Sequence, residues 1–175
     1  VLFRSESVFH HEIVGGFRIN DNHYVGAEAF TENVELQALQ DLEWNIKSVA
    51  GRYRFSFLDG FSIEPGGRYR YGSGEEIAGN EFDAYLWEAS LRFGYTRTKL
   101  FDGFARFSTV RVETDDNIPY QMMSGYSAGM TYRLEASAQL SVNQNISFGL
   151  HYVLRFGDAE ENIFQKLSME ARAMF

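Results

Sequence analysis

The chain has 175 residues and a formal net charge of −8, from 24 Asp and Glu against 16 Lys and Arg. This length predicts a single domain, and the acidic balance argues against a nucleic-acid partner, which needs a basic surface. Cys is absent, which excludes disulfides, thiolate metal sites and cysteine nucleophiles. No apolar run reaches the 18 residues of a membrane-spanning helix. With 16 Phe, 10 Tyr and only 2 Pro, the composition suits a β-barrel.

The N-terminus offers little structural signal. No secretory signal peptide is recognisable there, so the chain is either mature or lacks its front. Residues 1–5 read Val-Leu-Phe-Arg-Ser, which a common sequencing adapter also encodes in one reading frame. They are therefore either a native start or a non-native leader, and we expect residues 6–175 to form the single domain.

Alternation of apolar and polar residues with a period of two, interrupted by turn residues, predicts nine strands. We expect them at residues 9–19, 23–30, 43–57, 61–71, 83–96, 104–112, 120–142, 146–156 and 164–175.

Three local features accompany the first four strands. Residues 31–42 read as a polar, acidic loop, although Val34, Leu36 and Leu39 could extend a strand or make a helical turn there. Trp44 and Ile46 have the wrong parity for their strand, which predicts a β-bulge near Ser48.

The third connection has two candidate turns. Asp59-Gly60 predicts a hairpin, and Pro65-Gly66-Gly67 competes with it.

The later strands have a clearer two-faced pattern. In residues 83–96 the outward face carries Tyr85, Trp87, Leu91 and Phe93. In residues 104–112 the parity is ambiguous, and Val110 and Val112 favour the even positions as the outward ones. Residues 120–142 hold one parity throughout, which predicts one unusually long strand.

Alternate connections differ in length and charge. The longer set, residues 31–43, 73–83, 113–119 and 157–163, contains no Lys or Arg. Because alternate connections of an up-and-down sheet share one end, this end is predicted to be strongly negative. Without these 14 acidic residues the net charge would be −8 + 14 = +6. They are Glu32, Glu35, Asp41, Glu43, Glu75, Glu76, Glu81, Asp83, Glu113, Asp115, Asp116, Asp158, Glu160 and Glu161.

The last strand carries the most specific pattern. From Leu167 to Phe175 every second residue is apolar, the residues between are mostly polar or charged, and the chain ends on the aromatic Phe175. This stretch resembles the closing strand of Gram-negative outer-membrane β-barrels, autotransporter-like or small porin-like ones in particular. The resemblance implies an antiparallel up-and-down transmembrane barrel, N-terminally truncated from ten to twelve strands because such barrels have even strand numbers.

The same resemblance implies a location and partners. It places the protein in the outer membrane, against lipid and lipopolysaccharide, and makes Phe175 part of an insertion signal for the barrel-assembly machinery. The shorter turns would be periplasmic and the acidic rim extracellular. The expected lipid-facing residues are Tyr85, Trp87, Leu91, Phe93, Tyr126, Met130, Tyr132, Phe148, Leu150, Tyr152, Leu154, Leu167 and Met169.

The opposite face of the strands is ionic and mixed in sign. Its residues would either interlock as a salt-bridged filling or line a pore and favour anions. The predicted network consists of Arg52, Arg54, Glu64, Arg68, Arg70, Glu88, Arg92, Arg133, Glu135, His151, Arg155, Lys166, Glu170 and Arg172.

This pattern favours a passive pore or structural barrel without catalytic, cofactor or metal sites. One alternative is a translocator or anchor for a missing passenger domain. Another is an acyl hydrolase in which Ser137, His151 and Glu170 act as nucleophile, base and orienter. The acidic loops could also bind divalent cations diffusely. The simpler interpretation is that these loops form a rim that only contacts solvent.

A soluble ligand-binding barrel is the alternative fold. It requires the aromatic face, with Trp87, Phe93 and Phe148, to line a cavity while the arginines point into water.

Overall fold

The computed structural model describes residues 5–37, 41–76, 81–97, 100–114, 122–142, 146–158 and 163–173. Nine β-strands account for most of these residues, and no helix occurs among them. The strands are β1 Ser5–Asn20, β2 His23–Gln37, β3 Asp41–Phe57, β4 Phe61–Glu76, β5 Glu81–Arg97, β6 Phe101–Thr114, β7 Gly129–Ser141, β8 Ile146–Gly157 and β9 Phe164–Ala173.

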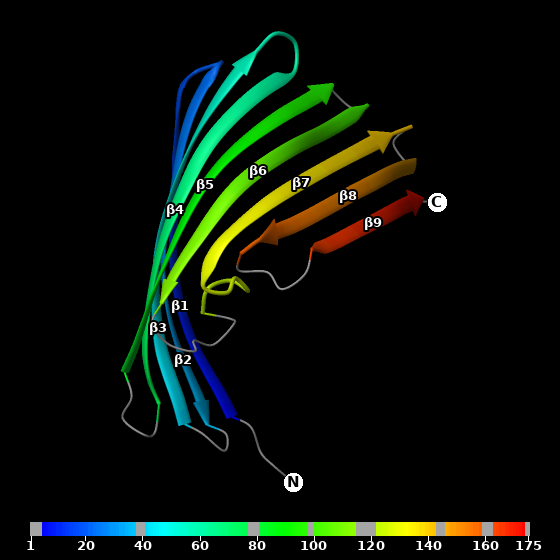
Figure 1. Ribbon diagram of the computed structural model, residues 1–175. Helices are drawn as coiled ribbons and strands as arrows, with labels where there is room; N and C mark the ends of the chain where they lie inside the picture. Colours follow the sequence, from blue (N-terminus) through cyan, green and yellow to red (C-terminus); the bar gives the residue numbers. More distant parts are fainter. Residues whose placement is uncertain are drawn as a thin grey trace.

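The strands form a single antiparallel sheet in which each strand pairs with its neighbours in the chain, in the order β1 to β9. The sheet curls around one side and leaves that side concave (Figure 1). It is not closed, because the described parts of β1 and β9 each pair on one edge only. The predicted all-β, up-and-down antiparallel architecture is therefore confirmed.

Several predicted boundaries are wrong because the strands run further than alternation suggested. Residues 31–37 belong to β2 and pair with the start of β3, although they were predicted as a loop. Likewise β4 continues to Glu76, and β5 begins at Glu81. Polar residues are tolerated in these strand ends because cross-strand backbone hydrogen bonds do not depend on the side chain.

The predicted bulge near Ser48 is also wrong. The β2–β3 ladder runs without a shift from Gln37–Asp41 to His23–Phe55. Trp44 and Ile46 share the parity of the concave face. They are buried on that face, 4% and 2% exposed. The register shift that does occur lies in β1, between Arg18 and Asn20.

The β3–β4 turn is the predicted Asp59-Gly60 hairpin, and Pro65 lies inside β4. Gly60 has φ of 93°, and a Cβ there would lie 2.1 Å from the carbonyl oxygen of Thr96. Only glycine fits this turn without a clash.

The long strand predicted over residues 120–142 is wrong in its first half. Residues 122–125 form a turn, and β7 begins only at Gly129. Ser124 and Gly125 both have positive φ, 56° and 78°, which breaks the extended backbone. Residues 122–128, directly before β7, consequently lie against the concave side of the sheet (Figure 1).

The pairing register assigns every strand residue to one face. In β6 the odd positions align with the odd positions of β5. Val110 and Val112 therefore lie on the concave face, where they are 0% and 3% exposed. The prediction that they point outward is wrong, because they belong to an apolar cluster on the concave face.

Candidate functional site on the concave face

The predicted ionic network lies on one face of the sheet. The cross-strand pairs align all fourteen of its members on the concave side, from β3 to β9. The set is Arg52, Arg54, Glu64, Arg68, Arg70, Glu88, Arg92, Arg133, Glu135, His151, Arg155, Lys166, Glu170 and Arg172.

Glu64 is the most enclosed carboxylate of this face. Its side chain is 5% exposed, and it accepts a hydrogen bond from Nε of Arg54 at 2.7 Å. The guanidinium of Arg92, from the neighbouring strand, lies 3.9 Å away. Two cations thus share one buried carboxylate, which offsets the cost of its desolvation.

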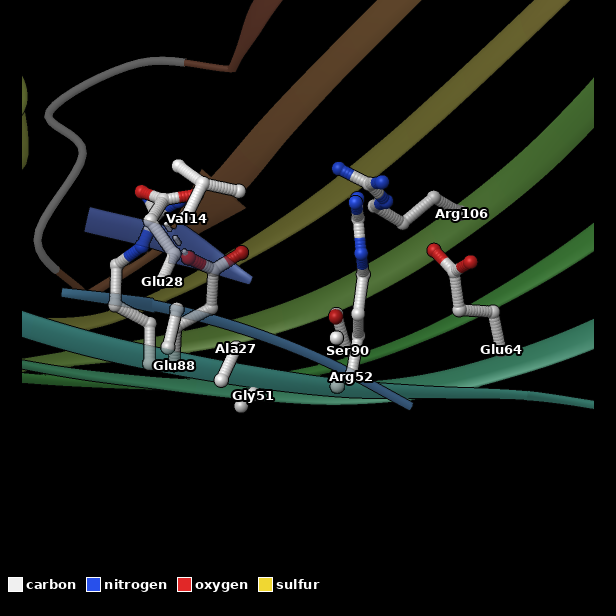
Figure 2. A pocket seen from close by; sticks show the side chains of 14 residues that line it. Val14, Ala27, Glu28, Gly51, Arg52, Glu64, Glu88, Ser90 and Arg106 are labelled. Carbon is white, nitrogen blue, oxygen red and sulfur yellow. Dashed lines mark ion pairs between the residues drawn. The ribbon is translucent and has the colours of Figure 1, made fainter. Parts of the chain in front are cut away.

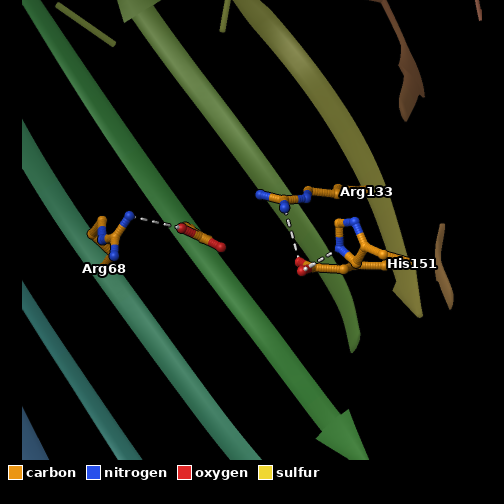
Figure 3. Close-up of polar contacts among 5 residues, drawn as sticks. Arg68, Arg133 and His151 are labelled. Carbon is orange, nitrogen blue, oxygen red and sulfur yellow. Dashed lines mark hydrogen bonds and ion pairs between the residues drawn. The ribbon is translucent and has the colours of Figure 1, made fainter. Parts of the chain in front are cut away.

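Glu135 is likewise shared by two groups, Arg133 and His151, and Glu88 pairs with Arg68 (Figure 3). Glu135 accepts a hydrogen bond from Arg133 at 2.8 Å and lies 3.2 Å from Nε2 of His151. Glu88 lies 3.8 Å from Arg68. The carboxylates of the concave face are therefore spaced as counter-charges between arginines.

Among the arginines that β3 to β9 place on this face, four make no ion pair with the described residues. Arg70 donates a hydrogen bond to the backbone oxygen of Met122 at 3.3 Å. Arg155 lies over the ring of Tyr126, with its guanidinium carbon 4.9 Å from the centroid. The other two, Arg52 and Arg106, line a hollow near the middle of the sheet.

This central hollow has a volume of about 160 Å³. Its floor is formed by small concave-face residues, Gly26, Ala50, Gly66 and Ser90. Glu28 and Glu88 project at one side of it, and Arg52 and Arg106 point toward one another at the other, beside Glu64 (Figure 2).

An apolar cluster closes the acidic end of the same face. Residues 122–126, which we call the inner plug, insert Met122 and Met123 at 0% exposure and Tyr126 at 6%. Gly72 makes room for them, since a Cβ there would lie 2.4 Å from Cε of Met122. The plug packs against Val34, Trp44, Ile46, Phe82, Ala84, Leu86, Val110 and Val112.

Sequence reasoning missed both the plug and Arg106. Arg106 was overlooked because the parity of its strand was misassigned. The signal for the plug was loss of alternation: Phe82, Ala84 and Leu86 interleave with Tyr85 and Trp87, so both faces of β5 are apolar near the acidic end. Apolar side chains on the concave face of such a strand need a cover there, which the plug supplies.

The hydrolase geometry is contradicted in part. Ser137 does pair directly with His151, but the residue opposite His151 on β9 is Ser168. Glu170 pairs with Gly149 and forms its ion pair with Arg172. The carboxylate that contacts His151 is Glu135, which already binds Arg133, so the predicted orienter is absent from this place.

The convex face carries the residues predicted to face lipid, with one exception. Tyr126 is buried in the inner plug, so its predicted outward position is wrong. Trp87 is 53% exposed and Met169 78%, which contradicts the soluble-barrel alternative, where this face would line a cavity. The other convex members are Tyr85, Leu91, Phe93, Met130, Tyr132, Phe148, Leu150, Tyr152, Leu154 and Leu167.

The acidic residues gather at one end of the sheet, mostly on strand ends and not in loops. Nine of the fourteen lie within strands, at the ends of β2, β4 and β6 and the starts of β3 and β5. Asp158 lies in a turn after β8. Asp115, Asp116, Glu160 and Glu161 lie outside the described residues, as does the predicted insertion signal Phe175.

Comparison with protein families and with curated proteins finds no match for this chain. In the described part of the sequence, no helix has the length and apolarity needed to cross a bilayer. The same residues contain no group of three or more His, Asp or Glu side chains placed to hold a metal ion.

Proposed function

We propose that this sheet is part of a Gram-negative outer-membrane β-barrel that acts as a passive pore, with the convex face against lipid and the concave face toward a wet interior. The observation that carries the proposal is a band of uncharged, apolar side chains around the convex face, bounded on both sides by aromatic rings. Soluble proteins rarely expose so large a continuous apolar surface.

The height of this band fits a bilayer. On β5 it extends from Tyr85 to Tyr95, which is roughly 33 Å of strand at about 3.3 Å per residue. A strand tilt of about 40° reduces this to a height of about 25 Å, the value typical of transmembrane barrels. Among the described convex residues, the charged ones lie beside the aromatic rings that bound the band or beyond them. Lys47 pairs with Tyr71, Arg111 pairs with Trp87, and Arg97 follows Tyr95 on the same face of β5.

Aromatic side chains gather at both edges of the band. Near the short turns, rings from Phe57, Phe61 and Tyr95 follow one another, with centroids 6.2 and 4.5 Å apart. Toward the acidic end, the rings of Tyr69 and Trp87 contact one another in a tilted arrangement with centroids 4.3 Å apart, and those of Tyr71 and Tyr85 do so at 5.2 Å. Such girdles are typical of the two interfaces of a membrane barrel.

The concave face supports the same orientation. Arginines near the midplane of a bilayer cost about 2–4 kcal/mol each when they face lipid, but they are stable beside water and carboxylates. The short turns of such barrels are periplasmic, so the acidic rim at the other end is the extracellular one in this proposal. The proposal also includes three expected partners. They are lipopolysaccharide, divalent cations bound diffusely at this rim, and the barrel-assembly machinery.

The two tryptophans allow a direct test of orientation. Trp44→Phe leaves only Trp87 on the convex face, and Trp87→Phe leaves only Trp44, which is 4% exposed under the plug. In vesicles of lipids brominated on their acyl chains, we expect the fluorescence of Trp87 to be quenched several times more than that of Trp44. Equal quenching, or stronger quenching of Trp44, would contradict the proposal.

Pore activity needs a separate measurement. Vesicles containing the protein should swell in isotonic solutions of small polar solutes, and vesicles without protein serve as the control. Correct orientation without solute flux would identify a structural barrel with an ionic filling instead of a pore.

A further inference from the structure

We propose that the central hollow of the concave face binds a small solute that carries one oxyanion group, a carboxylate above all, between Arg52 and Arg106, and a neutral or cationic body beside Glu28. The inference deepens the proposed function, since it names the solute class that the wet face selects. It requires only that water reaches this face.

Arg52 and Arg106 can meet because the residues between them are small. Arg52 on β3 pairs with Gly66 on β4, Gly66 with Ser90 on β5, and Ser90 with Ser108 on β6. Arg106 lies two residues from Ser108 on the same face of β6, in the neighbouring row with Arg92 and Glu64. The row of Arg52 itself therefore holds no long side chain on β4, β5 or β6 that separates it from Arg106. Figure 2 shows both groups approaching one another above Ser90.

Glycines also position Arg52. At Gly26 an added Cβ would lie 3.0 Å from Nε of Arg52, and at Gly66 it would lie 3.7 Å from Cβ of Arg52 and 3.2 Å from the hydroxyl of Ser90. Any larger residue would displace the guanidinium or cover the serine hydroxyl.

The charges around the hollow are unevenly compensated. Glu64 is occupied by Arg54 and Arg92, and neither Arg52 nor Arg106 forms an ion pair with the described residues. In addition, Nε of Arg106 is buried without a hydrogen-bond partner there. Two adjacent guanidinium groups with free donors repel each other and are relieved by an oxyanion, which can accept from both.

The opposite side of the hollow restricts the rest of the ligand. Glu28 and Glu88 line that side, and of these two only Glu88 has a cation among the described residues, Arg68, within ion-pair distance. A second anionic group would be repelled there, whereas an ammonium group would be attracted. The chemistry therefore favours a zwitterion such as a free amino acid over a dianion.

Ligand-observed NMR on the full chain in detergent micelles tests the inference with three probes: acetate, the free amino acid glycine, and pyrophosphate. We expect glycine to bind with a dissociation constant on the order of 1 mM, and pyrophosphate to bind more weakly. Arg52→Gln and Arg106→Gln should each weaken glycine binding by about tenfold, because each removes charge-assisted hydrogen bonds. Arg106→Lys keeps the charge and should recover part of the affinity.

Matched variants separate the site from general charge effects. Arg111→Gln removes an arginine from the convex face of the same strand, where it pairs with Glu113 at 2.7 Å, and should leave binding unchanged. Glu28→Gln should weaken glycine but not acetate.

Two outcomes would overturn the inference: unchanged glycine binding in Arg52→Gln and Arg106→Gln, or pyrophosphate binding as tightly as glycine. Because binding is measured in micelles, either failure leaves the membrane orientation and the vesicle flux untouched.

Discussion

The two faces of this sheet solve different physical problems with the same backbone. The convex face carries an apolar, uncharged band between charged ends, and its side chains are widely exposed, with Ile13 and Met169 each 78% accessible. The concave face carries arginines and glutamates, several of them in ion pairs, together with a dense apolar plug at one end. A side chain therefore has its energetic role set mainly by the face on which it lies.

The concave face is itself divided. At the acidic end it behaves like the core of a soluble protein, with Met122 and Met123 fully buried. Toward the middle it holds guanidinium groups and an open hollow. Arg70 joins the two parts by its hydrogen bond to the backbone of Met122, so the plug is anchored to the ionic region.

The largest effect should come from placing the same charge on either face of β8. Leu150→Arg puts a guanidinium in the convex apolar band and should lower the free energy of unfolding in phospholipid vesicles by about 3 kcal/mol. Gly149→Arg, one residue earlier, points to the concave side next to Glu170, where a Cβ meets only the Cβ of Glu170 at 3.8 Å. It should change stability by about 0.5 kcal/mol at most. Urea titration measures both, and equal losses would abolish the distinction between the faces.

Two methionines sharpen the same comparison. Met122→Ala removes a fully buried side chain of the plug and should cost about 2–3 kcal/mol, near the low end for such truncations because the turn can relax. Met169→Ala on the convex face, 78% exposed, should cost well under about 1 kcal/mol in detergent. A Met122→Ala protein as stable as the parent chain would argue against the inserted plug.

Removing a shared carboxylate should have a somewhat smaller effect. Glu64→Gln leaves Arg54 and Arg92 without their common counter-charge and should cost about 2 kcal/mol, since a buried charged hydrogen bond is lost. Glu113→Gln breaks the exposed pair with Arg111 and should cost about 0–0.5 kcal/mol. The unfolding midpoints of the two variants, compared at low and at high salt, test this; similar losses in both would mean that Glu64 is effectively solvated.

The smallest difference should appear between two glycines. Gly72→Ala would place a methyl group 2.4 Å from Cε of Met122, and the flexible methionine can move away, so we expect a loss of about 1 kcal/mol. Gly51→Ala on the convex face meets nothing within 4 Å and should be neutral or slightly stabilising. Acrylamide quenching of Trp44 provides a second measurement, because a displaced plug exposes this indole.

Much of the sheet could be predicted from residue order alone. Strand residues alternate between faces with a period of two, so Trp87 and Arg92 separate onto opposite sides whatever the neighbouring strands do. This local property was enough to predict the nine strands, their antiparallel order and the face of every member of the ionic network.

The order of residues along the chain did not determine which residues contact one another across the sheet. Val110 and Val112 lie on the concave face, where the plug covers them. The plug in turn packs on apolar side chains that β3, β5 and β6 place together on that face. The neighbour of His151 depends on the register of β8 with β9, where Ser168 takes the place expected for Glu170. Register and burial are properties of several strands together, because a two-residue slip preserves every face and changes every partner.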